Sequence, residues 1–363
     1  MLYRIEYSEF IYKGEFMNST DKEKYIENLC SWINEVSISE EHKNKILYYS
    51  NNLLANNRPV IFDKKHIYKI FGFRKSYTDF LERYYHCFYI DNINKKRLIK
   101  APSRKLKSVQ KWILDNILVT IEISKEAYGF VKGRSIYDNA KQHCNNQFAL
   151  CIDIKDFFGS IYIDKVLALF IEAGYSFEAS QELSKICCCK DIYNNYVLPQ
   201  GAPTSPYIAN IVCKELDEEL SDLAKRSKAV YTRYADDITF SAQEDISELY
   251  TEVYNILKKY KFRINDKTRY YTNNNPKFIT GLVVQNGKVR VPKKFKRDLR
   301  KEIYYCKRFG VDSHLENSNA NKRIHYREYL YGKAYYINMV EPDVGRVFLM
   351  EIDSIIWPDW ALR

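Results

Sequence analysis

Apolar residues recur at helical spacing near the start of the chain. Thr20 or Asp21 can cap a helix here, and a second apolar run lies between Ile46 and Leu54. The pattern predicts a helical N-terminal extension over residues 1–59. The apolar positions of the first run are Tyr25, Ile26, Leu29, Trp32 and Ile33.

Three short runs of apolar, β-branched and aromatic residues predict a small sheet at residues 148–154, 229–234 and 238–241. Asp153 lies near the end of the first predicted strand. Ala235, Asp236 and Asp237 separate the other two strands, which indicates a tight hairpin turn. If this hairpin pairs beside the first strand, three carboxylates come close together.

Other segments predict helices and a second hairpin. Residues 105–123 place apolar side chains on one helical face and charged ones on the other. Ser205 is the expected N-cap, with Pro206 in the first turn, of a helix that continues to Leu220. Residues 278–292 predict a hairpin that turns at Asn286, and the chain from Pro292 onward reads as helical and basic.

The charge is positive and unevenly distributed. Lys and Arg total 57 against 46 Asp and Glu, a difference of 57 − 46 = +11. Residues 92–145 hold 12 cationic against four acidic residues, and residues 293–308 hold eight against two. Clusters of one sign favour contact with nucleic-acid phosphates. The 32 Tyr suit base stacking, but the codon usage of a low-GC genome explains them equally well.

Several classes of protein are excluded. The longest apolar runs are far shorter than the roughly 20 residues that cross a bilayer, and the N-terminus lacks a signal-peptide pattern. We therefore expect a soluble, cytoplasmic protein without a membrane partner. The nine Cys include no C-x2-C pair, so we expect free thiols rather than a zinc site.

Converging carboxylates have a recognisable chemistry. They repel each other unless cations neutralise them, and Mg²⁺ takes hard oxygen ligands while leaving positions for phosphate. Two such ions about 3.5–4 Å apart stabilise both the attacking and the leaving oxygen of a phosphoryl transfer. Asp153, Asp236 and Asp237 are therefore the candidate catalytic residues.

Three segments resemble motifs A, B and C of reverse transcriptases, in the family's order. They are Ile152–Phe158, Pro199–Pro206 and Tyr234–Asp237, and the resemblance extends over about residues 90–340. It implies an α+β right-hand polymerase fold. The expected domains are an N-terminal extension (1–59), fingers (60–147 and 162–197), palm (148–161 and 198–287) and an RNA-binding thumb (288–363).

The resemblance also implies roles for individual residues. Asp153, Ile154, Asp236 and Asp237 would bind two Mg²⁺ ions, for which Mn²⁺ could substitute. Phe158 corresponds to the steric gate that rejects a ribose 2′-OH. The other residues implied to contact the deoxynucleoside triphosphate are Asp156, Phe157, Gln200, Lys267, Lys132 and Arg134.

Two further elements resemble retron reverse transcriptases. Residues 139–143 match the N-A-x-x-H pattern, and residues 279–281 match V-T-G with Ile in place of Val. Gly159 departs from the Pro that many relatives carry. Retron enzymes copy part of their own structured noncoding RNA from a guanosine 2′-OH. Their product is branched, multicopy single-stranded DNA (msDNA), made in antiphage systems that carry a separate effector protein.

The retron resemblance implies a set of RNA-contacting residues. For His143, a role in supporting the fold is an equal alternative. The set is Asn139, His143, Thr280, Gly281, Lys293, Lys294, Lys296, Arg297, Arg300 and Lys301.

Two other interpretations remain open at this point. One is a bacterial reverse transcriptase of another type, from a group II intron, a diversity-generating element or an abortive-infection system. The other is an RNA-binding scaffold without catalysis, which the intact Asp153, Asp236, Asp237 and Gln200 disfavour.

Overall fold

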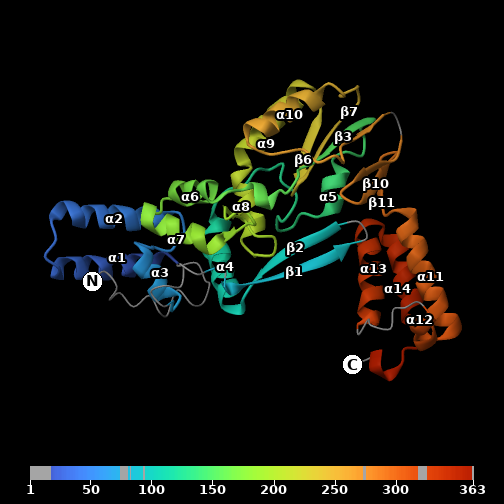
Figure 1. The fold of residues 1–363 in the computed structure, drawn as a ribbon, viewed down its shortest axis with the longest axis horizontal. Helices are drawn as coiled ribbons and strands as arrows, with labels where there is room; N and C mark the ends of the chain where they lie inside the picture. Colours follow the sequence, from blue (N-terminus) through green and yellow to red (C-terminus); the bar gives the residue numbers. More distant parts are fainter. Residues whose placement is uncertain are drawn as a thin grey trace. The chain divides into compact units, whose positions relative to one another are not determined.

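The computed structural model describes residues 18–73, 81, 83–92, 95–272, 275–317 and 325–361, drawn in Figure 1. The first 17 residues of the predicted N-terminal extension lie outside this part. The chain divides into two compact units. Unit 1 comprises residues 1–130, 154–219 and 255–264, and unit 2 comprises residues 131–153, 220–254 and 265–363. Across the described residues, no helix has the length and apolar character needed to cross a membrane.

Unit 1 begins with the predicted helical extension. Asn18, rather than Thr20 or Asp21, caps the first helix, because its side chain accepts the Asp21 amide at 2.9 Å. The buried side chains of this helix follow the predicted helical period. The helices are α1 (Ser19–Glu35), α2 (Glu40–Ala55) and α3 (Lys64–Ile70), and Figure 1 shows α1 beside α2.

A long antiparallel hairpin and a group of helices complete unit 1. The predicted helix over 105–123 ends at Asn116 and is followed by a short 3₁₀ turn. The elements are β1 (Tyr85–Asn92), β2 (Lys95–Pro102), α4 (Arg104–Asn116), η3 (Leu118–Thr120), η4 (Phe158–Ser160), α6 (Ile163–Glu172), α7 (Phe177–Cys187), β4 (Cys189–Lys190), β5 (Tyr196–Val197) and α8 (Ser205–Val212). Two helices, α9 (Lys214–Arg226) and α10 (Leu249–Lys259), run from one unit into the other.

The start of α8 corrects one prediction. Its N-cap is Thr204, and Ser205 is the first helical residue. The Ser205 hydroxyl donates to the Pro199 carbonyl at 2.8 Å, so it closes the preceding loop instead of capping the helix. The helix also stops at Val212, and α9 carries the remainder of the predicted apolar pattern.

Unit 2 contains the three strands predicted at residues 148–154, 229–234 and 238–241, joined by a fourth strand, β8, that was not predicted. Its main sheet has the strand order β6-β7-β3-β8, and all neighbours are antiparallel. A second sheet, β11-β10-β9, includes the predicted hairpin with its turn at Asn286 and Gly287. The elements are α5 (Ile136–Lys141), β3 (Phe148–Asp153), β6 (Val230–Tyr234), β7 (Asp237–Ala242), β8 (Arg269–Tyr271), β9 (Lys277–Ile279), β10 (Leu282–Gln285) and β11 (Lys288–Arg290).

The basic C-terminal segment of unit 2 is helical, as predicted. In α11, Leu299, Ile303 and Cys306 recur at helical spacing and are buried. One continuous apolar core includes these residues together with side chains of the β9–β11 sheet and Ala140 of α5. The helices are α11 (Lys293–Phe309), α12 (Val311–Asn317), α13 (Tyr326–Val340) and α14 (Pro342–Asp353), followed by η5 (Asp359–Ala361). The two units cut across the predicted fingers, palm and thumb boundaries, which stay a prediction.

Candidate active site

The main sheet of unit 2 places the predicted carboxylates at one end of neighbouring strands. Asp153 is the last residue of β3 and lies directly opposite Asp237, the first residue of β7. Tyr234 also pairs with Asp237, so Ala235 and Asp236 form a two-residue turn. The predicted hairpin and its position beside the first strand are therefore confirmed.

The turn that carries Asp236 has an unusual backbone conformation. Ala235 has a φ of +56°, a region that residues with a Cβ seldom adopt, and its side chain is buried. The guanidinium of Arg233, which is completely buried, donates to the Ala235 carbonyl at 3.3 Å. This contact helps to fix the turn, and local strain of this kind is often found at functional sites.

Asn265 orients the neighbouring carboxylate. Its side-chain amide donates to Asp153 Oδ1 at 2.8 Å, and its backbone amide donates to the Asp153 carbonyl at 2.8 Å. Two contacts from one residue hold both the main chain and the side chain of Asp153. The carboxylate therefore has a preferred direction before any ligand binds.

The carboxylates influence each other electrostatically. Burial raises the pKa of Asp237 to about 6, and the negative charges of Asp236 and Asp153 add to this effect. Arg269 and Lys267 oppose it, so Lys267 lies near enough to Asp237 to affect its charge. A half-buried group of like charges is a site that a cation would stabilise.

The donor set fits Mg²⁺ bound together with a substrate. Carboxylate oxygens are the hard ligands that this ion prefers. In the part of the chain that the structure describes, no three His, Cys, Asp or Glu side chains are grouped closely enough to hold a metal alone. Mg²⁺ is commonly bound by one or two carboxylates plus substrate phosphates, and two strand-end carboxylates meet that requirement.

His143 supports the sheet from its other end. The ring is fully buried, with Nδ1 at 2.6 Å from Ser241 Oγ on β7 and Nε2 at 2.8 Å from Thr232 Oγ1 on β6. Asn146 also donates to Ser241 Oγ at 2.7 Å. These contacts connect the segment after α5 to both strands of the Asp236 hairpin. They favour the fold-supporting alternative for His143, and its contact with RNA stays a prediction.

Burial of His143 predicts a pH-dependent stability. Its pKa is lowered to about 3, so between about pH 6.5 and 3 the unfolded chain binds a proton that the folded chain does not. The stabilisation is complete above pH 6.5 and is lost as the pH falls, at up to about 1.4 kcal/mol per pH unit. Urea unfolding at pH 7 and pH 5 should show the stability gap between wild type and His143→Gln narrowing by about 2 kcal/mol.

A matched variant controls for the loss of hydrogen bonds. Asn146→Ala removes contacts to the same Ser241 without removing the imidazole. Its stability gap to wild type should stay nearly constant between the two pH values. A His143→Gln gap that is equally constant would show that His143 is not held neutral by burial.

The two retron-like elements meet in unit 2. Asn139, on α5, donates from Nδ2 to Thr280 Oγ1 at 3.4 Å, and the Thr280 hydroxyl donates to the Ile136 carbonyl at 3.4 Å. Thr280 and Gly281 form the two-residue turn between β9 and β10, with φ values of +45° and +81°. Positive φ at both positions is typical of the type I′ hairpin turn, which explains the Gly.

Comparisons with known proteins identify the family of the chain. The family described as "Reverse transcriptase (RNA-dependent DNA polymerase)" matches residues 86–291. The Retron Ec86 reverse transcriptase of Escherichia coli is 37% identical over 226 residues, which cover 61% of this chain and 68% of the relative. The chain belongs to the reverse transcriptase family and is of the retron type. It is therefore an RNA-directed DNA polymerase with an α+β polymerase fold.

Other similar proteins cover the chain to different extents. The Retron Mx162 reverse transcriptase of Myxococcus xanthus is 34% identical over 291 residues, which cover 72% of this chain but only 58% of the relative. A solved telomerase from Candida albicans, in complex with a fragment of telomeric RNA, aligns with a TM-score of 0.42 at 13% identity. That alignment covers 76% of this chain and 61% of the telomerase chain.

In unit 1 of the reverse transcriptase, the two Phe residues of motif A differ in burial. Phe157 is buried, and its ring centre lies 5.8 Å from that of Phe262. Phe158 is half-buried, and its ring centre lies 6.2 Å from that of the exposed Phe130. Part of the Phe158 ring therefore stays open to a ligand, and its role as a steric gate stays a prediction.

Motif B of the reverse transcriptase approaches the β2 strand closely. The Gln200 carbonyl accepts the Lys100 amide at 3.0 Å, and the Gln200 side chain is exposed. Gly201 has a φ of +135°, and a Cβ there would lie 2.9 Å from the Lys100 carbonyl oxygen. Glycine is therefore needed at this position, because the backbone of β2 comes so close that a Cβ would clash with it.

The remaining predicted contacts of the reverse transcriptase are distributed over both units. Asp156 lies in unit 1, whereas Lys132, Arg134 and Lys267 lie in unit 2. Lys296 of α11 binds Glu341 at 2.7 Å and is largely buried, which favours a structural role; its RNA contact stays a prediction. The other predicted cations of α11 are exposed: Lys293, Lys294, Arg297, Arg300 and Lys301.

Sequence reasoning missed two residues that position the site. Asn265 was visible within the segment that contains Lys267, but its bond to Asp153 depends on a distant strand. Arg233 was visible as a charge inside an apolar strand, a pattern that indicates a buried and paired cation.

Proposed function

We propose that this reverse transcriptase starts DNA synthesis from a 2′-OH of a guanosine in its own noncoding RNA. It then copies part of that RNA into msDNA joined through a 2′,5′ bond. The observation that carries the proposal is the contact between Asn139 and Thr280, because it joins the two retron-like elements within the unit that bears the catalytic carboxylates. A separate effector protein would act with the product in antiphage defence.

The proposed catalytic roles follow from the residues of the site. Asp153 and Asp236, supported by Asp237, would hold two Mg²⁺ ions, with the main-chain oxygen of Ile154, since its side chain offers no ligand. When bound, the ions neutralise phosphate charge and lower the pKa of the attacking hydroxyl. Mn²⁺ could replace them.

The chain's own residues would position the deoxynucleoside triphosphate. The backbone amides of Asp156 and Phe157 would contact its phosphates, and Gln200 its base or the template. Lys267 would donate a proton to the leaving pyrophosphate, which suits its exposed position near Asp237. Lys132 and Arg134 would add positive charge for the triphosphate or the template.

The test is DNA synthesis by the purified protein with its cognate RNA, divalent metal and deoxynucleotides. We expect a branched product, of which RNase treatment leaves DNA carrying a residual ribonucleotide. RNA with 2′-deoxyguanosine at the priming position should give no product, while the same substitution at other guanosines should not prevent synthesis. Unbranched DNA made only from annealed primers would reject retron priming and keep the polymerase.

A further inference from the structure

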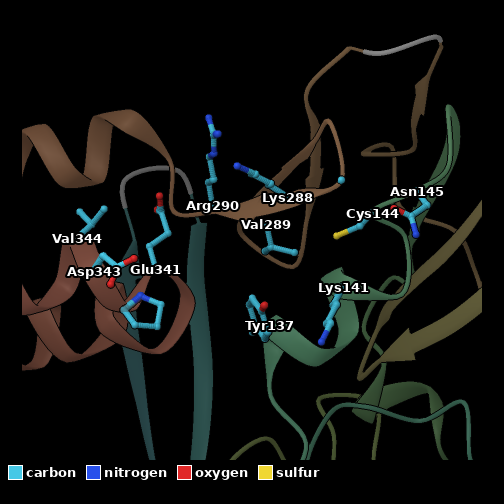
Figure 2. Close-up of a pocket in the computed structure, with 12 residues that line it drawn as sticks. Tyr137, Lys141, Cys144, Asn145, Lys288, Val289, Arg290, Glu341, Asp343 and Val344 are labelled. Atoms are coloured by element: carbon cyan, nitrogen blue, oxygen red, sulfur yellow. The ribbon is translucent and has the colours of Figure 1, made fainter.

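A polar pocket of about 490 Å³ lies within unit 2, away from the catalytic carboxylates in the sequence. Three parts of the chain line it: α5 with the residues that follow it, the β10–β11 hairpin, and the junction of α13 with α14. Figure 2 shows Tyr137 and Lys141 projecting from α5, and Lys288 and Arg290 from the hairpin. None of the residues that line this pocket is among the predicted catalytic, nucleotide-binding or RNA-binding residues.

The pocket has a surplus of positive charge. Its two acids are already paired: Glu341 with Lys296 at 2.7 Å and Asp343 with Arg346 at 2.5 Å. Lys141, Lys288 and Arg290 have no carboxylate partner among the residues that the structure describes. All three are exposed, so they can meet an anionic ligand without first breaking an ion pair.

The same pocket offers an aromatic ring and apolar contacts. Tyr137 is half-buried, and Lys141 Nζ lies 6.0 Å from its ring centre. Val289 and Val344 line the pocket as well. A flat apolar ring beside unpaired cations is the combination that binds a nucleobase together with its phosphates.

We propose that this pocket binds one unpaired nucleotide of a nucleic acid strand held by the enzyme. The volume lies within the range of about 300–1,000 Å³ that is typical of sites for one small ligand. A base-paired stem cannot enter a space of this size, whereas an unstacked nucleotide can. Tyr137 stacks on the base, and Lys288 and Arg290 contact the flanking phosphates.

The proposal rests on the proposed function, which supplies a noncoding RNA as the partner. The pocket shares α5 with Asn139 and lies on the hairpin that follows Thr280 in the chain. A nucleotide bound there would anchor a single-stranded part of the RNA next to the two retron-like elements. RNA recognition by unstacked bases is the usual source of sequence specificity.

The test measures binding of the full-length protein to three labelled probes by fluorescence anisotropy. The probes are a single RNA strand of mixed sequence of about 12 nucleotides, the DNA strand of the same sequence, and the corresponding RNA duplex. The first variant is Lys288→Ala/Arg290→Ala. A matched control, Lys24→Ala/Lys258→Ala, removes two exposed cations from α1 and α10.

Two results are expected for the single-stranded RNA probe. The Lys288→Ala/Arg290→Ala variant should bind at least tenfold more weakly, and its slope of log affinity against log salt should decrease by about 1.4, or about 0.7 for each lost phosphate contact. Tyr137→Leu should weaken binding about fivefold or more with an unchanged slope, because stacking releases no counterions. The control variant should match wild type.

The other outcomes separate the alternatives. Equal losses for the duplex and the single strand would overturn the proposal, since they would indicate a general basic surface. Unchanged binding of every probe would also overturn it and would favour an acidic protein as the ligand. A loss for RNA alone or for both single strands supports the proposal and identifies which strand supplies the nucleotide.

A second measurement does not depend on how variants fold. Wild-type protein is irradiated with 4-thiouridine-substituted RNA, and the crosslinked peptide is identified by mass spectrometry. We expect crosslinks at Tyr137 or Cys144, and crosslinks only on peptides outside the pocket would contradict the proposal. Failure of 2′-OH priming in the synthesis assay would leave both binding results interpretable, so the two proposals can fail separately.

Discussion

Asp236→Asn is expected to reduce DNA synthesis by about a thousandfold or more, because the reaction depends on charge stabilisation at this position. The substitution preserves size and removes one negative charge from the two-residue turn. Primer extension on an annealed RNA template, measured as single-turnover incorporation of one deoxynucleotide, reports this step. RNA affinity should stay within about twofold of wild type, since the turn adds no positive charge to the RNA-binding surface.

Two controls separate chemistry from folding. Asp222→Asn removes a charge from the exposed surface of α9, where Asp222 pairs with Lys225 at 2.8 Å, and should leave incorporation unchanged. Asp237→Asn removes a carboxylate whose pKa burial raises to about 6, so its unfolding temperature in EDTA should rise at pH 7.5. An Asp236→Asn protein that incorporates nucleotides at more than a tenth of the wild-type rate would contradict the assignment.

The local pattern was sufficient to predict three of the four strands of the main sheet, but not β8. Short runs of apolar, β-branched and aromatic residues identified these strands, and the short Ala235–Asp236 turn indicated the pairing of β6 with β7. Once β3 and β7 are antiparallel neighbours, the register places Asp153 opposite Asp237. Both hairpins and the basic C-terminal helix were predictable for the same reason, because their signals are contained in a few consecutive residues.

Contacts between distant segments were not predictable in this way. The bond from Asn265 to Asp153 spans 112 positions, and the contact of His143 with Ser241 spans 98. Nothing in the local sequence distinguishes a buried His from an RNA-binding one, so that choice needed the structure. The ion pair of Lys296 was not predictable either. Only the folded chain brings Lys296 next to Glu341, the residue that precedes α14.

Gly159 illustrates a departure from the family pattern that the structure explains. A Cβ at this position would lie 2.4 Å from Oδ2 of Asp156, so a larger residue would force that carboxylate to move. Asp156 itself has a φ of +48°, which turns the chain sharply within motif A, just after β3. The sequence alone indicated only the loss of a rigid Pro, whereas the structure connects Gly159 to the position of a neighbouring side chain.

Phe158→Ala is expected to reduce the preference for deoxynucleotides over ribonucleotides by about 100-fold, measured as the ratio of kcat/KM values for the two substrates. If the half-buried ring contacts the sugar, as the resemblance implies, its removal leaves space for a 2′-OH. Ribonucleotide incorporation should rise, while incorporation of deoxynucleotides should change much less. A ratio within threefold of wild type would show that Phe158 is not the steric gate.

The adjacent Phe157 provides a matched comparison. It is buried against Phe262, so Phe157→Ala should lower the free energy of unfolding by about 3–5 kcal/mol. Its sugar preference should stay near that of wild type in the fraction that remains folded. A loss of sugar preference in Phe158→Ala together with a loss of stability in Phe157→Ala would separate substrate selection from core packing. The two variants make the same chemical change at adjacent positions, so only the place of each ring in the structure differs. If the two variants instead behave alike, the difference in exposure between the rings does not determine which one contacts the sugar.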